Sequence, residues 1–141
     1  MDVAYWSPTS RADDLDVVGA ELDDVVATSD VLQVCIALTP TTHHLLDRRR
    51  LGLMPPGSLL VNTARGAVVD HAALVAALAA GHLGGYATDV WDPEPPPPGD
   101  LAPVAGRLLI TPHVAAITDT TYRTICVRAA EAALAALDLP D

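Results

Sequence analysis

The chain has 141 residues, a length typical of one domain, and half of them are hydrophobic although phenylalanine is absent. Its 18 acidic residues outnumber its 8 lysines and arginines, and the formal net charge of -10 argues against nucleic acid or an anionic membrane surface as a partner. A core built mainly from Ala, Val and Leu suits helices packed closely on a sheet.

The cysteines and the apolar runs indicate which cellular compartment and which cofactors the protein can be expected to have. Cys35 and Cys126 lie in apolar runs without CxxC spacing, and no histidine stands with them at metal-ligand spacing. We therefore expect buried free thiols and no metal site, with a disulfide as the alternative interpretation. The first residues lack the features of a signal peptide, and no apolar run reaches the roughly 18 residues of a membrane span. These features favour a soluble cytoplasmic protein with no membrane partner.

Strand and helix patterns alternate along the chain. The run 31–38 is nearly all apolar, which is the pattern of a strand covered on both faces. The expected strands are 3–6, 31–38, one that begins at residue 59, 84–90 and 107–112, and the expected helices are 22–29, 47–53, 71–80 and 118–136. There is no internal repeat, and this order predicts a single α/β domain, 1–141, with a doubly wound parallel sheet.

Charged side chains directly follow three of the predicted strands. Arg65 follows the strand that begins at residue 59, and its planar guanidinium suits bidentate capture of a carboxylate or phosphate. Asp89 stands at the end of the next strand with Glu94 just beyond it, and His113 follows the last strand. Because the carboxyl ends of parallel strands meet at one edge of a sheet, these groups can gather around one ligand. A histidine there can transfer a proton near neutral pH while a carboxylate orients its ring and raises its pKa, although taken singly Arg65 and His113 also fit ordinary surface residues.

Four stretches of the sequence, in register, resemble the dinucleotide-binding domain of a known enzyme family. They are SDVLQVCIALTPTTHHLLD (29–47), LLVNTARGAVVD (59–70), ATDVWDPEPP (87–96) and TPHVAAIT (111–118). The family is that of the D-isomer-specific 2-hydroxyacid dehydrogenases, which includes D-lactate, formate and phosphoglycerate dehydrogenases and the glyoxylate/hydroxypyruvate reductases. The resemblance covers almost the whole chain from Val3 and implies a Rossmann-like fold.

The resemblance also implies a role for each strand-end residue. Arg65 would bind the carboxylate of a small 2-hydroxy or 2-oxo acid substrate, and His113 would be the proton donor in reduction and the acceptor in oxidation. Glu94 would be the carboxylate partner of His113, and Asp89 would accept a hydrogen bond from the nicotinamide carboxamide. Ile36, Ala37, Thr42, Thr63 and Ala64, with Arg65 and His113, would line the cofactor, and the reaction would be hydride transfer between NAD or NADP and the acid.

The sequence departs from the family pattern in two respects. The family's GxGxxG loop and its substrate domain are absent from the 141 residues, so we expect the distal part of a cofactor domain, incomplete at its N-terminal side, from a longer chain or a truncated gene product. Ser7 stands where NAD-preferring members place an acidic residue, and Arg11 follows shortly after. This pair slightly favours NADP over NAD, while an ordinary turn fits the same two residues equally well.

Two hypotheses of function follow from these features. The first is an oxidoreductase of this family, because Arg65, Glu94 and His113 are all present in the family context. The second is a non-catalytic dinucleotide-domain remnant that acts as a binding or dimerisation module, because the glycine-rich loop is absent. Loss of the first strand–helix–strand unit would expose the edge of a central strand, so we also expect a homodimer.

Overall fold

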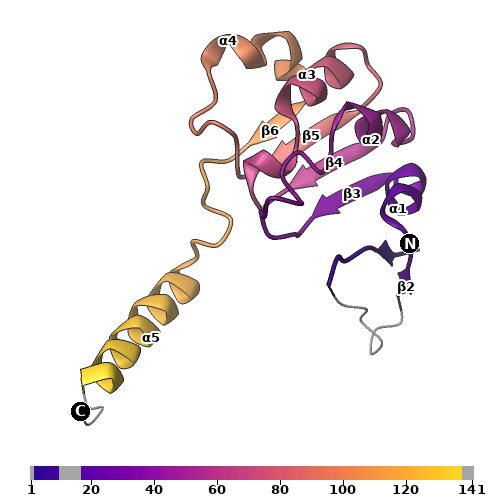
Figure 1. Cartoon of the computed structure of the whole chain (residues 1–141). Helices are drawn as coiled ribbons and strands as arrows, with labels where there is room; N and C mark the ends of the chain where they lie inside the picture. The colour runs from indigo at the N-terminus through magenta and orange to yellow at the C-terminus, as the bar shows by residue number, and fades with distance from the viewer. Residues whose placement is uncertain (1, 10–16, 138–141) are drawn as a thin grey trace.

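The computed structural model describes residues 2–9 and 17–137 and contains two parallel sheets (Figure 1). Strands β1 (Ala4–Tyr5) and β2 (Val18–Gly19) form a separate pair. The main sheet has the order β3-β4-β5-β6, and its strands are β3 (Val31–Val34), β4 (Leu59–Asn62), β5 (Gly85–Thr88) and β6 (Leu108–Ile110). Every neighbouring pair in it is parallel, which confirms the predicted α/β fold.

Most of the helices connect these strands, and those with a predicted capping residue begin where that residue predicts. The helices are α1 (Leu22–Thr28), α2 (Arg48–Leu53), α3 (His71–Ala79), α4 (Pro98–Leu101) and α5 (Asp119–Leu137), with 3-10 segments η1 (Gly66–Val68) and η2 (Ala102–Arg107). The carboxylate of Asp47 accepts a hydrogen bond from the Arg50 N–H, and that of Asp70 accepts one from the Ala73 N–H. Helix α3 gives way to Gly81, whose φ of 72° lies in the left-handed region that glycine tolerates. Helix α4 and η2 are not predicted by the sequence.

The hydrophobic core lies on one face of the main sheet. Leu32, Leu60 and Tyr86 are register partners on that face and are buried together with the apolar side chains of α1, α2 and α3. Val31 and Leu59, one residue earlier on β3 and β4, are 56% and 45% exposed because they point to the opposite face. The expectation that 31–38 is covered on both faces is therefore wrong: the strand ends at Val34, and only alternate residues are buried.

The second face is open because α5 does not pack on it. Figure 1 shows α5 running away from the sheet beyond β6, and apart from Thr121 its side chains from 119 to 136 are exposed. The expectation of buried thiols is also wrong, because both cysteines are exposed, although both are free. Cys126 lies on α5, which does not pack on the sheet, and Cys35 follows the end of β3. Within residues 2–9 and 17–137, no helix has the length and apolar character needed to cross a bilayer.

Candidate active site

A hollow of about 200 Å³ lies beyond the carboxyl ends of β4 and β5. Segments that follow β3, β4, β5 and β6 all contribute to its wall, as the topology of a parallel sheet predicts. Its lining residues are Leu38, Arg65, Gly66, Ala67, Val90, Trp91, Asp92, Glu94 and His113. The hollow therefore brings together the three residues for which the sequence predicts a catalytic role.

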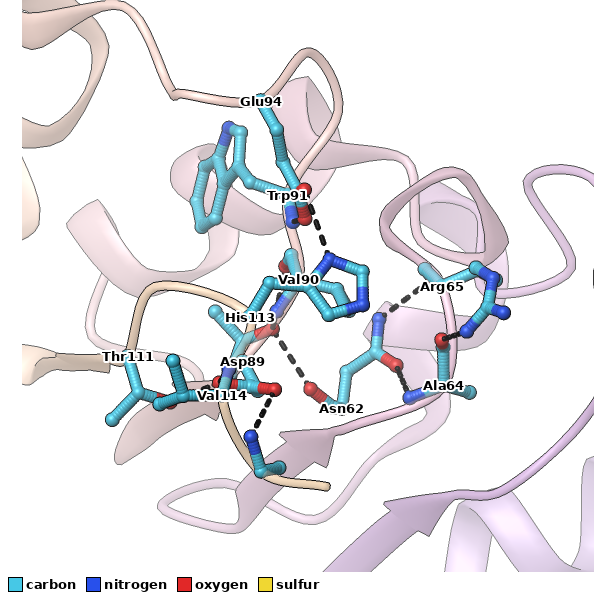
Figure 2. A network of polar contacts seen from close by, with 12 residues as sticks. Asn62, Ala64, Arg65, Asp89, Val90, Trp91, Glu94, Thr111, His113 and Val114 are labelled. Atoms are coloured by element: carbon cyan, nitrogen blue, oxygen red, sulfur yellow. Dashed lines mark hydrogen bonds and ion pairs between the residues drawn. The ribbon is translucent and has the colours of Figure 1, made fainter. Parts of the chain in front are cut away.

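Asn62 fixes the loop that carries Arg65. It is the last residue of β4 and is fully buried. Its Nδ2 donates to the carbonyl oxygen of Arg65 at 3.0 Å, and its Oδ1 accepts from the Ala64 N–H at 3.0 Å. The guanidinium itself donates from Nη1 to the carbonyl oxygen of Ala64 at 2.6 Å, so the side chain turns back over its own backbone rather than toward His113 (Figure 2). Arg65 thus lines the hollow with its backbone anchored, while its charged group has no carboxylate partner among the described residues.

Asp89 fixes the loop that carries His113. Its carboxylate is buried and accepts three hydrogen bonds, from the Thr111 hydroxyl at 2.6 Å and from the Val114 and Ala115 N–H groups at 2.8 Å each. Burial opposes ionisation, but these donors together hold the pKa of Asp89 below its ordinary value. The loop between the donors places His113 at a φ of 57°, in the left-handed region, so Asp89 stabilises an unfavourable backbone conformation at the histidine.

Glu94 and His113 form a bonded pair. The Oε1 atom of Glu94 accepts from the Trp91 N–H at 2.8 Å, and its Oε2 lies 3.1 Å from Nδ1 of His113 (Figure 2). The Trp91 amide, and next the His113 ring, hold the pKa of Glu94 below its ordinary value. Because an ionised carboxylate only accepts hydrogen bonds, Nδ1 carries the ring hydrogen, and Nε2 is the nitrogen that can exchange a proton with a ligand.

The other residues expected to line the cofactor follow β1, β3 and β4. Thr42 is buried, and its hydroxyl donates to the Ala37 carbonyl oxygen at 2.7 Å, so it closes the loop after β3. Thr63 is exposed beyond β4 and accepts from the Gln33 side chain at 3.2 Å. Ile36 is partly buried against the core, and Ser7 follows β1. Arg11 lies outside the described residues, and the cofactor roles of all these residues stay predictions.

The sequence analysis did not single out Asn62, Trp91 or Thr111. Asn62 carried a usable signal, because it stands two residues after Leu60 in a strand and therefore shares its buried face. A polar residue at a buried strand position must bond its side chain locally. The roles of Trp91 and Thr111 depend on backbone geometry and carry no such pattern.

Comparison with known proteins places this geometry in a wider set. A family model described as "D-isomer specific 2-hydroxyacid dehydrogenase, NAD binding domain" matches residues 1–115. The (S)-sulfolactate dehydrogenase of Chromohalobacter salexigens is 38% identical over 124 residues, which are 88% of this chain and 38% of that protein. The glyoxylate reductase of Aeropyrum pernix is 36% identical over 134 residues, which are 93% of this chain and 40% of that protein. The chain therefore spans about two fifths of the length of these relatives.

Solved structures agree with the fold. The D-lactate dehydrogenase of Aquifex aeolicus, complexed with NAD and lactic acid, is similar over 97% of this chain and 46% of that one, at a TM-score of 0.86 and 28% identity. A D-isomer specific 2-hydroxyacid dehydrogenase of Xanthobacter autotrophicus Py2, in complex with NADPH and MES, is 39% identical at a TM-score of 0.76, over 83% of this chain and 38% of that one. The parallel sheet and its helices are thus those of an NAD-binding domain of the Rossmann type.

Proposed function

The chain belongs to the D-isomer-specific 2-hydroxyacid dehydrogenase family. We therefore propose that it takes part in catalysis of hydride transfer between a nicotinamide cofactor and a small 2-hydroxy or 2-oxo acid. The observation that carries the proposal is the bonded Glu94–His113 pair in the wall of the hollow that Arg65 also lines. The described residues suit the nicotinamide end of the cofactor. Three of the roughly four acceptor positions of the Asp89 carboxylate bind donors of the loop that carries His113, which leaves one position for a carboxamide. The 141 residues contain no GxGxxG cradle for the pyrophosphate.

The proposed chemistry divides between two side chains. Nε2 of His113 donates a proton to the carbonyl oxygen of the oxo acid in reduction, and Glu94 stabilises the positive form of the ring through Nδ1. Arg65 leaves the Ala64 carbonyl and binds the substrate carboxylate through two parallel N–H groups. When bound, the nicotinamide supplies or accepts the hydride.

We propose NADP as the preferred cofactor, because Ser7, after β1, stands where an acidic residue would bind the ribose hydroxyls of NAD. A cytoplasmic location and a homodimer are also proposed. The homodimer is supported by the open sheet face, on which Val31, Leu59 and Leu109 are 45% to 65% exposed. A non-catalytic binding or dimerisation module is the second candidate function, and it is favoured by the same open face.

Cofactor binding and turnover separate the two candidates. We expect NADPH to bind more tightly than NADH by calorimetry, and we expect reduction of glyoxylate or hydroxypyruvate to consume the reduced cofactor. His113→Gln should lower kcat by about 10²–10⁴-fold, the usual contribution of a positioned acid or base. Arg65→Lys should raise KM because a lysine cannot bind a carboxylate through a planar fork, whereas Arg48→Lys, an exposed arginine of α2, is the matched control.

The outcomes are distinct. Binding of either cofactor without turnover on any 2-oxo acid supports the module and contradicts the enzyme. Failure to bind NADH and NADPH contradicts both candidates as nucleotide-dependent functions.

A further inference from the structure

Trp91 lies on the segment that carries Glu94 and packs against the segment that carries Arg65. It follows β5, and its indole is buried. The imidazole of His71, at the start of α3, stacks on this indole with ring centroids 4.1 Å apart and planes inclined by 24°. Burial lowers the pKa of His71 to about 4, so the stacked ring is neutral at neutral pH. One face of Trp91 is therefore held by an uncharged aromatic partner.

The backbone of Trp91 is held separately, by Gly66. A Cβ atom on Gly66 would overlap the carbonyl carbon and oxygen of Trp91 and would lie 2.7 Å from the amide nitrogen of Asp92. Only a glycine permits this contact between the two segments of the chain. The residue next to Arg65 thus touches the peptide that begins the Trp91–Glu94 turn.

The backbone amide of Trp91 is hydrogen-bonded to the Glu94 carboxylate, which is in turn hydrogen-bonded to His113. Trp91 N–H donates to Oε1 of Glu94 at 2.8 Å, and Oε2 of the same carboxylate meets Nδ1 of His113 at 3.1 Å. The carboxylate is 40% exposed and the imidazole 53% exposed, so packing around the pair does little to fix either side chain. The Trp91 amide is the fixed end of this chain of hydrogen bonds.

We propose that Trp91 is a positioning residue, clamped by His71 and Gly66, that sets the Glu94–His113 pair at a constant distance from Arg65. The inference rests on the proposed function, because a substrate whose carboxylate is bound by Arg65 and whose adjacent carbonyl oxygen meets His113 requires a constant distance between these two groups. Trp91 touches no reacting atom in this scheme. It acts through its amide, and the lowered pKa of Glu94, of which that amide is the largest cause, agrees with the geometry.

The first test compares two glycine variants without substrate or cofactor. Gly66→Ala displaces the peptide group between Trp91 and Asp92, which adjoins the Trp91 N–H. In Gly52→Ala, in α2, the new methyl group meets nothing within 4 Å, so this variant is the matched control. Hydrogen exchange of the Trp91 amide, followed by NMR, should accelerate by at least about tenfold in Gly66→Ala, since a hydrogen bond to a charged group is lost. The carboxyl carbon of Glu94 should titrate at a higher pH than in the wild type, and Gly52→Ala should change neither.

The second test keeps the backbone intact and changes the stacked ring. His71→Ala removes the stack and should raise both the exchange rate of the Trp91 amide and the titration midpoint of Glu94, while His71→Phe restores an aromatic face and should return both toward the wild type. If Gly66→Ala does not fold, this pair decides. Wild-type exchange and wild-type Glu94 titration in folded His71→Ala would overturn the proposal. Because no readout needs turnover, an inactive protein tests the clamp as well as an active one, and kcat is measured separately.

Discussion

Acidification should destabilise this protein through His71 before its carboxylates are protonated. The ring is buried against Trp91 and its pKa is lowered to about 4, against 6.5 for an unperturbed histidine. Between these two values the unfolded chain binds a proton that the folded chain refuses, so stability falls as the pH falls. Above about pH 6.5 both states are neutral, and below about pH 4 both are protonated, so the loss is confined to that window.

The size of this loss follows from the difference between the two pKa values. About 2.5 pKa units correspond to an upper limit of about 3.4 kcal/mol at 1.36 kcal/mol per unit. Because solvent still reaches part of the ring, we discount this limit to about 1–2 kcal/mol. A loss of this size is a measurable fraction of the roughly 5–15 kcal/mol that stabilises a typical domain.

His71→Phe isolates the effect, because phenylalanine keeps an aromatic ring against Trp91 and has no proton to bind. The free energy of unfolding is measured by urea titration of both proteins at several values between about pH 7 and about pH 4.5. The wild type should lose about 1–2 kcal/mol more than the variant over this range. Asp89 and Glu94, whose pKa values are lowered, contribute stability that is lost only as the pH falls through the acidic range, and they do so in both proteins. A difference between wild type and variant that does not change with pH would refute the assignment.

Two further substitutions test the fold and the loops. Leu60→Ala should cost about 2–5 kcal/mol by urea unfolding because Leu60 is fully buried, whereas Leu59→Ala, on the open face, should cost less than about 1 kcal/mol, and equal costs would contradict the one-sided core. Asp89→Asn replaces an acceptor oxygen by an amide that faces an N–H donor, and it should cost about 1–3 kcal/mol and accelerate amide exchange at Val114 and Ala115. Asp119→Asn, exposed at the start of α5, is its control, and unchanged exchange in Asp89→Asn would show that the carboxylate does not hold the loop.

Local signals predicted the order of the elements and the edge at which the site lies. The caps at Asp47 and Asp70 are short-range hydrogen bonds, and apolar runs bounded by turns marked the four strands of the main sheet. Because the strands are parallel, the placement of Arg65, Glu94 and His113 around one hollow followed from chain order alone.

Local signals could not predict which groups within that hollow bond to one another, and the Glu94–His113 pairing was expected only from the family resemblance. The Glu94–His113 contact depends on a left-handed residue and on the Trp91 amide, neither of which leaves a mark in composition. The direction of the Arg65 guanidinium is likewise decided by the nearby Ala64 carbonyl. Burial failed where it depended on distant segments, since a nearly continuous apolar run at β3 predicts cover on both faces whether or not a helix packs there.

The geometry of the candidate site depends on the register between β4 and β5. Asn62 pairs with Thr88, and the Asn62 carbonyl oxygen accepts from both the Thr88 hydroxyl at 2.8 Å and the Asp89 N–H at 3.1 Å. The anchor of the Arg65 loop is thus bonded directly to the anchor of the His113 loop. Because side chains alternate between the two faces of a sheet, a shift of the strand register by one residue would turn Asn62 out of its buried position. The hydrogen bonds that anchor both loops would then be lost together. The sheet therefore determines where the loops that carry Arg65 and His113 begin, and the Trp91 clamp proposed above acts on the Glu94–His113 pair beyond that point.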